Sequence, residues 1–120
     1  MIILNETIII DESINTEWLN WMKAVHIPAV MATGHFNSYQ ILHVLSSPNE
    51  GITYCVQYTA DNMEQYNAYQ GKYATQLKNN HFKQFENKFV QFESIMQLVS
   101  WYESYNHTYW RTINNRAKGF

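Results

Sequence analysis

One histidine stands where a side chain could carry acid–base chemistry. At about 100° per residue, Trp18 and Met22 share the apolar stripe of an amphipathic helix, and His26 lies at the edge of that stripe. Pro28 disfavours helical geometry at Ile27 and has no amide hydrogen, so we expect the helix to end or kink there, with His26 at the bend. An imidazole titrates near neutral pH and, at the rim of a cavity, can act as a general acid or base. The alternative is a helix-end histidine that hydrogen-bonds to a backbone carbonyl.

Polar and aromatic side chains elsewhere could complete a ligand site beside this histidine. Gln57 lies in a predicted strand, and Gln70 falls in the middle of the apolar stripe of a second predicted helix. A buried amide needs hydrogen-bond partners, so either glutamine could orient a ligand. The predicted apolar walls are Trp18, Met22, Tyr66 and Tyr73. The alternative is that these four side chains fill an ordinary core without a cavity.

No recognised catalytic or cofactor motif accompanies these residues. HExxH, CxxC, GxSxG, GxGxxG and the phosphate-binding loop are all absent from the sequence. The histidines are scattered, and none is spaced four residues from another: His26, His35, His43, His81 and His107. We therefore expect no metal site, and we infer no cofactor.

The hydrophobic pattern predicts the order strand, helix, strand, strand, helix, strand. The strands are expected at residues 2–10, 35–45, 52–60 and 88–98, and the strand at 52–60 alternates most clearly between two faces. Asp61 and Glu64 are typical of a capping box that begins the second helix, and residues 79–87 are expected to be a connector with room for one more helical turn. The inner stripe of that helix is predicted to hold Met63, Tyr66, Gln70, Tyr73, Ala74 and Leu77, with Tyr69 on its flank.

This order of elements is the ferredoxin-like, or split βαβ, arrangement. We expect an α+β domain with an antiparallel four-stranded sheet and both helices on one face. Because apolar residues occupy both faces of the strands, a second copy of the chain is the natural cover for the other face, and we expect a homodimer. Glu6 and Glu93 lie in mid-strand, where they could be buried acids, but we expect exposure at an edge or rim.

The stretch from residue 17 to residue 36 also resembles a family signature. It reads Glu-Trp-Leu-x-Trp-Met-x-x-x-His-Ile-Pro-x-Val-Met-Ala-Thr-Gly-x-Phe, and Thr53-Tyr54-x-Val56-Gln57-Tyr58 and Lys88-Phe89-Val90-x-Phe92 follow it. Over residues 1–98 the chain resembles domain-of-unknown-function family 4286, which itself resembles the dimeric α+β barrel superfamily. Several members of that superfamily carry His-x-Pro near the end of the first helix, where His26 and Pro28 stand. The resemblance implies a fold and a cavity position, but no activity.

Composition narrows the classes of partner. A net charge of −2 offers no basic footprint for nucleic acid, and the single cysteine, Cys55, excludes an intramolecular disulfide. No apolar stretch approaches about 18 residues, so we expect no membrane partner and a cytoplasmic location. Residues 99–120 form a predicted aromatic extension with a basic end, which either packs on the partner subunit or stacks on nucleic-acid bases. Its aromatic and basic residues are Trp101, Tyr102, Tyr105, Tyr109, Trp110, Arg111, Arg116 and Lys118.

Three functions are compatible with the sequence. The first is a small dimeric protein that binds an apolar or aromatic metabolite between helices and sheet. The second is a cofactor-independent monooxygenase or isomerase in which His26 is the acid or base. The third is a structural or interaction dimer without a ligand. A polar-lined cavity beside His26 would favour the first two, and a solid core there would favour the third.

Overall fold

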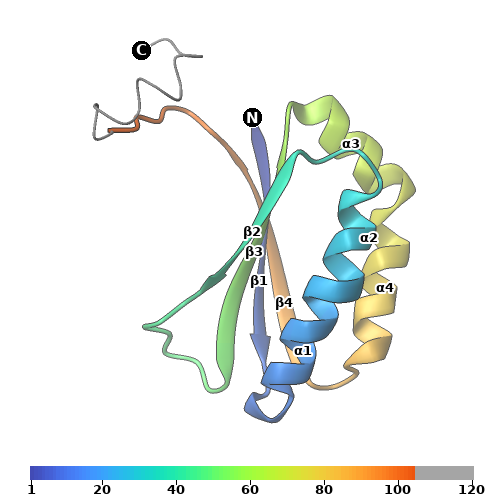
Figure 1. Ribbon diagram of the computed structural model, residues 1–120, viewed down its shortest axis with the longest axis vertical. Coiled ribbons are helices and arrows are strands. Elements are labelled where there is room, and N and C mark those ends of the chain that lie inside the picture. Colours follow the sequence, from blue (N-terminus) through green and yellow to red (C-terminus); the bar gives the residue numbers. More distant parts are fainter. Residues whose placement is uncertain (105–120) are drawn as a thin grey trace.

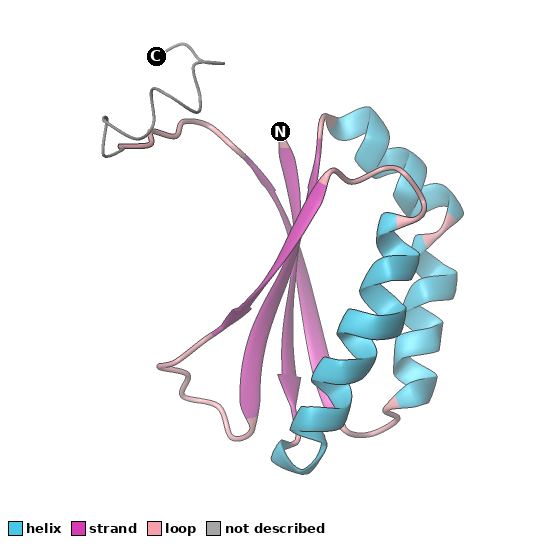
Figure 2. Cartoon of the chain, viewed as in Figure 1, coloured by secondary structure: helices cyan, strands magenta, loops and turns pink. Residues whose placement is uncertain are grey.

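The chain folds into one antiparallel sheet with a layer of helices on one side. The computed structural model describes residues 1–104. The four strands lie in the order β2-β3-β1-β4, and the helices cover a single face of the sheet, as Figure 1 and Figure 2 show. The elements are β1 (Ile2–Ile10), the 3₁₀ turn η1 (Glu12–Ile14), α1 (Asn15–Trp21), the π-helical turn η2 (Met22–His26), α2 (Ile27–Met31), β2 (Ser38–His43), β3 (Ile52–Ala60), α3 (Met63–Lys72), α4 (Ala74–Gln84) and β4 (Phe89–Gln97). The predicted ferredoxin-like α+β fold is confirmed.

Strand register divides the side chains between a covered face and an open face. In the central pair of strands, Leu4 lies opposite Tyr58 and Ile8 lies opposite Tyr54, and all four are buried beneath the helices. The residues between them point the other way because successive side chains of a strand alternate. The alternation predicted for residues 52–60 is therefore confirmed. The core fills the space between the covered face and the helices.

The first helix does not end at its proline. Ile27 keeps helical dihedral angles, and its amide donates to the Met22 carbonyl, five residues earlier. An α-helix would leave the Ala24 carbonyl without a donor because Pro28 has no amide hydrogen, and the wider π turn lies immediately before this position. Of the two expected outcomes at Pro28, an end or a kink, the end is wrong, because the chain continues as α2. The segment α2 ends at Met31, and Gly34 follows it with a left-handed φ of 81°.

The second helical segment differs from its prediction in its cap and its length. Asn62, rather than Asp61, is the cap, and its side-chain oxygen accepts from the Gln65 amide at 3.0 Å. Helical structure resumes after a break at Tyr73 and runs through α4, so most of the expected connector at 79–87 is helix.

The inner stripe of this helical segment also differs from the prediction. Tyr69 is buried, whereas Met63 is 44% exposed, because the first turn of α3 extends past the core. The second strand, β2, is shorter than the expected 35–45.

The remaining predictions concern the end of the chain. Trp101 and Tyr102 are exposed. The other predicted residues of the extension, Tyr105, Tyr109, Trp110, Arg111, Arg116 and Lys118, lie outside the described residues, so the division at residue 98 stays a prediction. Across residues 1–104, no helix has the length and apolar character needed to cross a membrane.

Candidate functional site

His26 lies inside the core rather than at a rim. It is only 5% exposed, and its ring stacks on Trp21 with 5.3 Å between centroids. The His81 ring lies 5.4 Å away on the other helical segment. The Nδ1 atom of His26 is buried and has no hydrogen-bond partner among residues 1–104. Burial lowers the pKa of His26 to about 4, so at neutral pH it is an uncharged base.

His81 connects the first helix to the last strand. Its Nε2 accepts a hydrogen bond of 3.0 Å from the indole Nε1 of Trp18, so the neutral ring carries its proton on Nδ1. The ring also stacks on Phe89, with 4.1 Å between centroids. Burial and the neighbouring His26 lower the pKa of His81 to about 3, although a hydrogen bond with Gln91 opposes this shift.

These aromatic rings form a continuous group, here called the histidine–tryptophan cluster: Trp18, Trp21, His26, His81, Phe85 and Phe89. Sequence reasoning missed His81 because it placed residues 79–87 in a connector. The spacing Leu77, His81, Phe85 repeats every four residues, and this helical signal could have found it.

The other predicted wall residues separate from one another. Trp18 and Met22 are fully buried around the histidines. Tyr66 is buried among the charged groups described below, and Tyr73 lies beside His35, with 5.7 Å between their rings. Gln70 has a buried side-chain oxygen without a hydrogen-bond partner in the described part of the chain. Trp18 and His26 therefore both lie against His81, and Met22 lies on the same helical turn as His26, whereas Tyr66 and Tyr73 lie elsewhere.

Gln57 lies on the open face of the sheet, away from His26. Its Oε1 accepts from Gln40 at 2.8 Å, and its Nε2 donates to Asn5 at 3.1 Å. These three side chains span β2, β3 and β1, and we call them the amide row. Asn5 in turn donates to the Thr7 hydroxyl at 3.1 Å. Gln57 does not share a cavity with His26, because side chains that alternate with Val56 and Tyr58 point away from the helices.

A second polar group lies between the covered face of the sheet and the helices near β4, and it contains both mid-strand acids. Glu93 is exposed, as expected, whereas Glu6 is not. Glu6 is only 6% exposed, because β1 is a central strand and position 6 faces the helices. Its cross-strand neighbour Glu93 forms an ion pair of 3.0 Å with Lys78 of α4. Burial, reinforced by Glu93 and opposed by Lys78, raises the pKa of Glu6 to about 8. The carboxyl group of Glu6 is therefore largely neutral at pH 7.

Tyrosines complete this second group, here called the carboxyl–tyrosine cluster: Glu6, Glu93, Lys78, Tyr58, Tyr66 and Tyr69. The hydroxyl of Tyr58 is buried, and it has no hydrogen-bond partner within residues 1–104. Burial, and then the nearby Glu6, raises the pKa values of Tyr58 and Tyr69, so both hydroxyls keep their protons.

A groove between α4 and β4 adjoins both clusters. It has a volume of about 490 Å³ and is lined by Lys78, Asn79, Phe82, Phe89, Gln91 and Glu93. Phe89 and Gln91 contact His81, whereas Lys78 and Glu93 face Glu6. Phe82 remains 53% exposed, so the groove offers an accessible aromatic wall.

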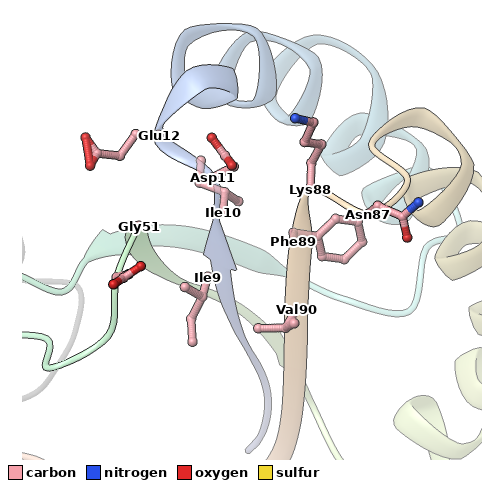
Figure 3. A pocket seen from close by; sticks show the side chains of 10 residues that line it. Ile9, Ile10, Asp11, Glu12, Gly51, Asn87, Lys88, Phe89 and Val90 are labelled. Atoms are coloured by element: carbon pink, nitrogen blue, oxygen red, sulfur yellow. The ribbon is translucent and has the colours of Figure 1, made fainter.

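A second hollow lies at the end of β1, seen in Figure 3. It has a volume of about 550 Å³ and is lined by Ile9, Ile10, Asp11, Glu12, Glu50, Gly51, Asn87, Lys88, Phe89 and Val90. Gly51 is required there, since its φ is 88° and a Cβ atom would meet the Ile10 carbonyl oxygen at 2.4 Å. No group of three or more histidine, cysteine or acidic residues that could hold a metal ion occurs in residues 1–104. The groove is lined by Lys78 and Glu93, which interact with the buried Glu6, so the groove is the better candidate.

Comparisons with known proteins agree with the fold. A family model described as "Domain of unknown function (DUF4286)" matches residues 1–99, in line with the signature at 17–36. No curated protein sequence matches the chain.

Among solved structures, a dimeric ferredoxin-like protein from an uncultured marine organism has a TM-score of 0.64 at 12% identity, over 87% of this chain and 100% of its own. HapK from Hahella chejuensis has a TM-score of 0.62 at 13% identity, over 87% and 99%. An ethyl tert-butyl ether d (ethd) family protein from Bacillus halodurans has a TM-score of 0.58 at 11% identity, over 82% and 100%. At these identities the likeness shows the fold alone.

Proposed function

Because the chain belongs to the DUF4286 family, whose description names no activity, we propose its function from its own geometry. We propose that it binds a small aromatic or apolar molecule in the groove between α4 and β4. The site would then lie between helices and sheet, with His26 behind its wall.

The observation that carries this proposal is the composition of the groove. Phe82 and Phe89 supply aromatic surface, and Gln91 and Glu93 supply polar atoms on the same strand. Small-molecule sites are typically concave and mostly apolar, with a few polar groups that fix orientation. A planar ring with one polar substituent fits this arrangement.

Ligand titration tests the groove directly. Indole and 2-naphthol would be titrated into isotope-labelled protein while the amide and side-chain signals of the groove residues are followed by NMR. Phe82→Ala should weaken binding about tenfold, because it removes an aromatic wall without removing core packing. Val25→Ala is the matched control, since Val25 is similarly exposed on η2, away from the groove.

A result without groove perturbations, or equal affinity in Phe82→Ala and the parent protein, would refute the proposal. Absence of binding by any aromatic probe would favour the third hypothesis from the sequence, a dimer without a ligand.

We further propose that the protein works as a homodimer through the open face of the sheet. The apolar side chains of that face are exposed in the single chain, at 54% for Val90, 60% for Phe92 and 42% for Leu42. The marine protein with the same fold is described as dimeric. A specific interface of standard size would bury about 1,600 Å² in total, and a four-stranded face offers a surface of this kind.

Sedimentation velocity at micromolar concentration tests the dimer. Phe92→Glu should convert it to a monomer, because a carboxylate would be buried without a partner in the interface. Val25→Glu introduces the same charge on the helical side and should leave the dimer intact. A monomeric parent protein would contradict the proposal.

A second candidate function is a cofactor-independent isomerase or monooxygenase with His26 as the base. The specific observation is its buried Nδ1, which has no hydrogen-bond partner within residues 1–104, on a ring that is neutral at pH 7. Exchange of deuterium into the α-carbon of a cyclic ketone would reveal proton abstraction. The exchange should disappear in His26→Gln and persist in His43→Gln, since His43 is exposed on β2.

A further inference from the structure

Two buried side chains that carry oxygen atoms, Glu6 and Tyr58, lie on the covered face of the central strands. The Tyr58 hydroxyl lacks a partner in the described chain, and the Glu6 carboxyl interacts with it electrostatically. We propose that Glu6 and Tyr58 together form a two-donor site for the carbonyl, enolate or phenolate oxygen of a ligand. This inference rests on the proposed function, because the body of that ligand would occupy the groove between α4 and β4.

Strand register places the two donors at a suitable separation. Glu6 lies opposite Val56, so Tyr58 is its diagonal neighbour on the same face of β3. Diagonal neighbours have Cα atoms about 7–8 Å apart, which leaves long side chains within reach of a shared atom. Since the Tyr58 hydroxyl has no partner in residues 1–104, the two groups are not hydrogen-bonded to each other. An oxygen atom between them could therefore accept from both.

Both groups act as donors near neutral pH. Glu6 is faced by Glu93 from β4, by Lys78 from α4, and by three tyrosines, Tyr58 from β3 and Tyr66 and Tyr69 from α3. Burial dominates these influences and keeps the carboxyl group neutral until about pH 8. A neutral carboxylic acid paired with a tyrosine is an arrangement that enzymes use to stabilise an enolate oxygen.

The ion pair between Lys78 and Glu93 lies where the groove meets this site. Both residues line the groove, and both interact with Glu6, which does not line it. A ring lying against Phe82 in the groove would therefore be next to the two residues that interact with Glu6. The alternative occupant of the site is a resident water molecule, which needs two to four polar partners of the same kind.

The probe for this site is 4-nitrophenol, whose phenolate absorbs at longer wavelength than its phenol. Titration at pH 7 should yield bound phenolate, and Tyr58→Phe should weaken its binding about tenfold. Glu6→Gln keeps a neutral donor, so binding at pH 7 should change less than threefold. In the parent protein binding should fall above pH 8 as Glu6 ionises, and this fall should be absent from Glu6→Gln. Tyr54→Phe is the matched control, because the Tyr54 hydroxyl already donates to Asn15 at 2.6 Å.

A ligand-free measurement keeps the inference separate from the proposed function. Carbon-13 NMR of labelled glutamate, assigned with Glu6→Gln, should show a neutral Glu6 carboxyl at pH 7. An ionised Glu6 would overturn the inference and leave the groove untouched. Binding lost in Phe82→Ala but unchanged in Tyr58→Phe would overturn it as well, while supporting the groove. If no phenol binds the parent protein, or only a resident water fills the site, the inference fails, and indole titration alone decides the groove.

Discussion

The polar side chains on the two faces of the sheet differ in their hydrogen bonding. On the open face, the amides of Gln40, Gln57 and Asn5 hydrogen-bond to one another across three strands. On the covered face, the Tyr58 hydroxyl has no partner within residues 1–104, although it is more deeply buried. The same central strand supplies both faces, since Asn5 and Glu6 are adjacent.

This difference separates a structural role from a binding role. Satisfied amides make a surface that another sheet can cover at little cost, because their hydrogen bonds survive burial. Buried polar groups without partners cost free energy, and a protein retains such groups where a ligand supplies the missing bonds. We therefore propose the open face as the interface and the covered face near Glu6 as the binding site.

The largest expected effect contrasts aromatic residues on the two faces. Trp18→Ala should lower the free energy of unfolding by about 3–5 kcal/mol, because Trp18 is fully buried and donates to His81. Phe92→Ala on the open face should change the stability of the monomer by less than about 1 kcal/mol, since its ring is 60% exposed. Urea unfolding, at a protein concentration too low for the dimer to form, measures both changes in stability. Equal losses would erase the distinction between the faces.

The next effect is a gain in stability when the buried acid is removed. An unfolded glutamate ionises near its ordinary pKa of 4.5, whereas folded Glu6 keeps its proton until about pH 8. The unfolded state therefore binds fewer protons between these values, and stability falls as pH rises through this window. Glu6→Gln should raise the free energy of unfolding at pH 7 by roughly 3 kcal/mol and leave it unchanged at pH 4.

Urea titrations at pH 4 and pH 7 check this gain. Glu86→Gln is the control, because Glu86 is exposed after α4. A destabilised Glu6→Gln at pH 7 would mean that Glu6 is an ionised and well-paired structural group, and the covered face would then resemble the open one.

The third expected effect is a loss of stability as pH falls, which is opposite in direction to the effect of Glu6. Burial lowers the pKa of His26 to about 4 and that of His81 to about 3, so the folded state resists protonation that the unfolded state accepts near pH 6.5. Stability is therefore lost as pH falls below about 6.5, by roughly 2 kcal/mol per histidine between pH 7 and pH 5. His26→Gln should remove its share of this slope, and His43→Gln should not. An unchanged slope in His26→Gln would show that its ring is solvated.

Sequence periodicity was sufficient for the fold because the central strands have a strong apolar pattern. The alternation in 52–60 and the apolar run at 2–10 correspond to β3 and β1 with the expected bounds. The proline at position 28 misled the prediction, since a π turn can replace the missing hydrogen bond without ending a helix. Asn62 and Asp61 are both good caps, and only the three-dimensional path of the chain selects between them.

The candidate site was harder to predict because it depends on contacts between distant elements. The pattern Asn5-Glu6-Thr7 interrupts an apolar strand, and sequence alone could not say that β1 is central and that Glu6 faces the helices. His81 and Lys78 lie in a helix whose polar sequence gives little amphipathic signal. Strand order and helix docking bring these residues together, and neither property is local in the sequence.

The smallest expected effect tests the amide row itself. Gln57→Leu removes its centre and leaves the side chains of Gln40 and Asn5 without that partner. In the monomer water can replace the lost hydrogen bonds, so the free energy of unfolding should change by less than about 1 kcal/mol.

In the dimer the same amides would be buried, and each unsatisfied group should cost about 1–3 kcal/mol, which weakens association at least several-fold. Sedimentation equilibrium measures this change. Gln76→Leu, which breaks a 3.1 Å hydrogen bond to Asn80 on the surface of α4, is the matched control and should leave association unchanged. A tighter dimer in Gln57→Leu would mean that the amide row does not lie in the interface. In that case Gln57 would be an exposed glutamine next to an apolar contact, and leucine could replace it without the cost of an unsatisfied group.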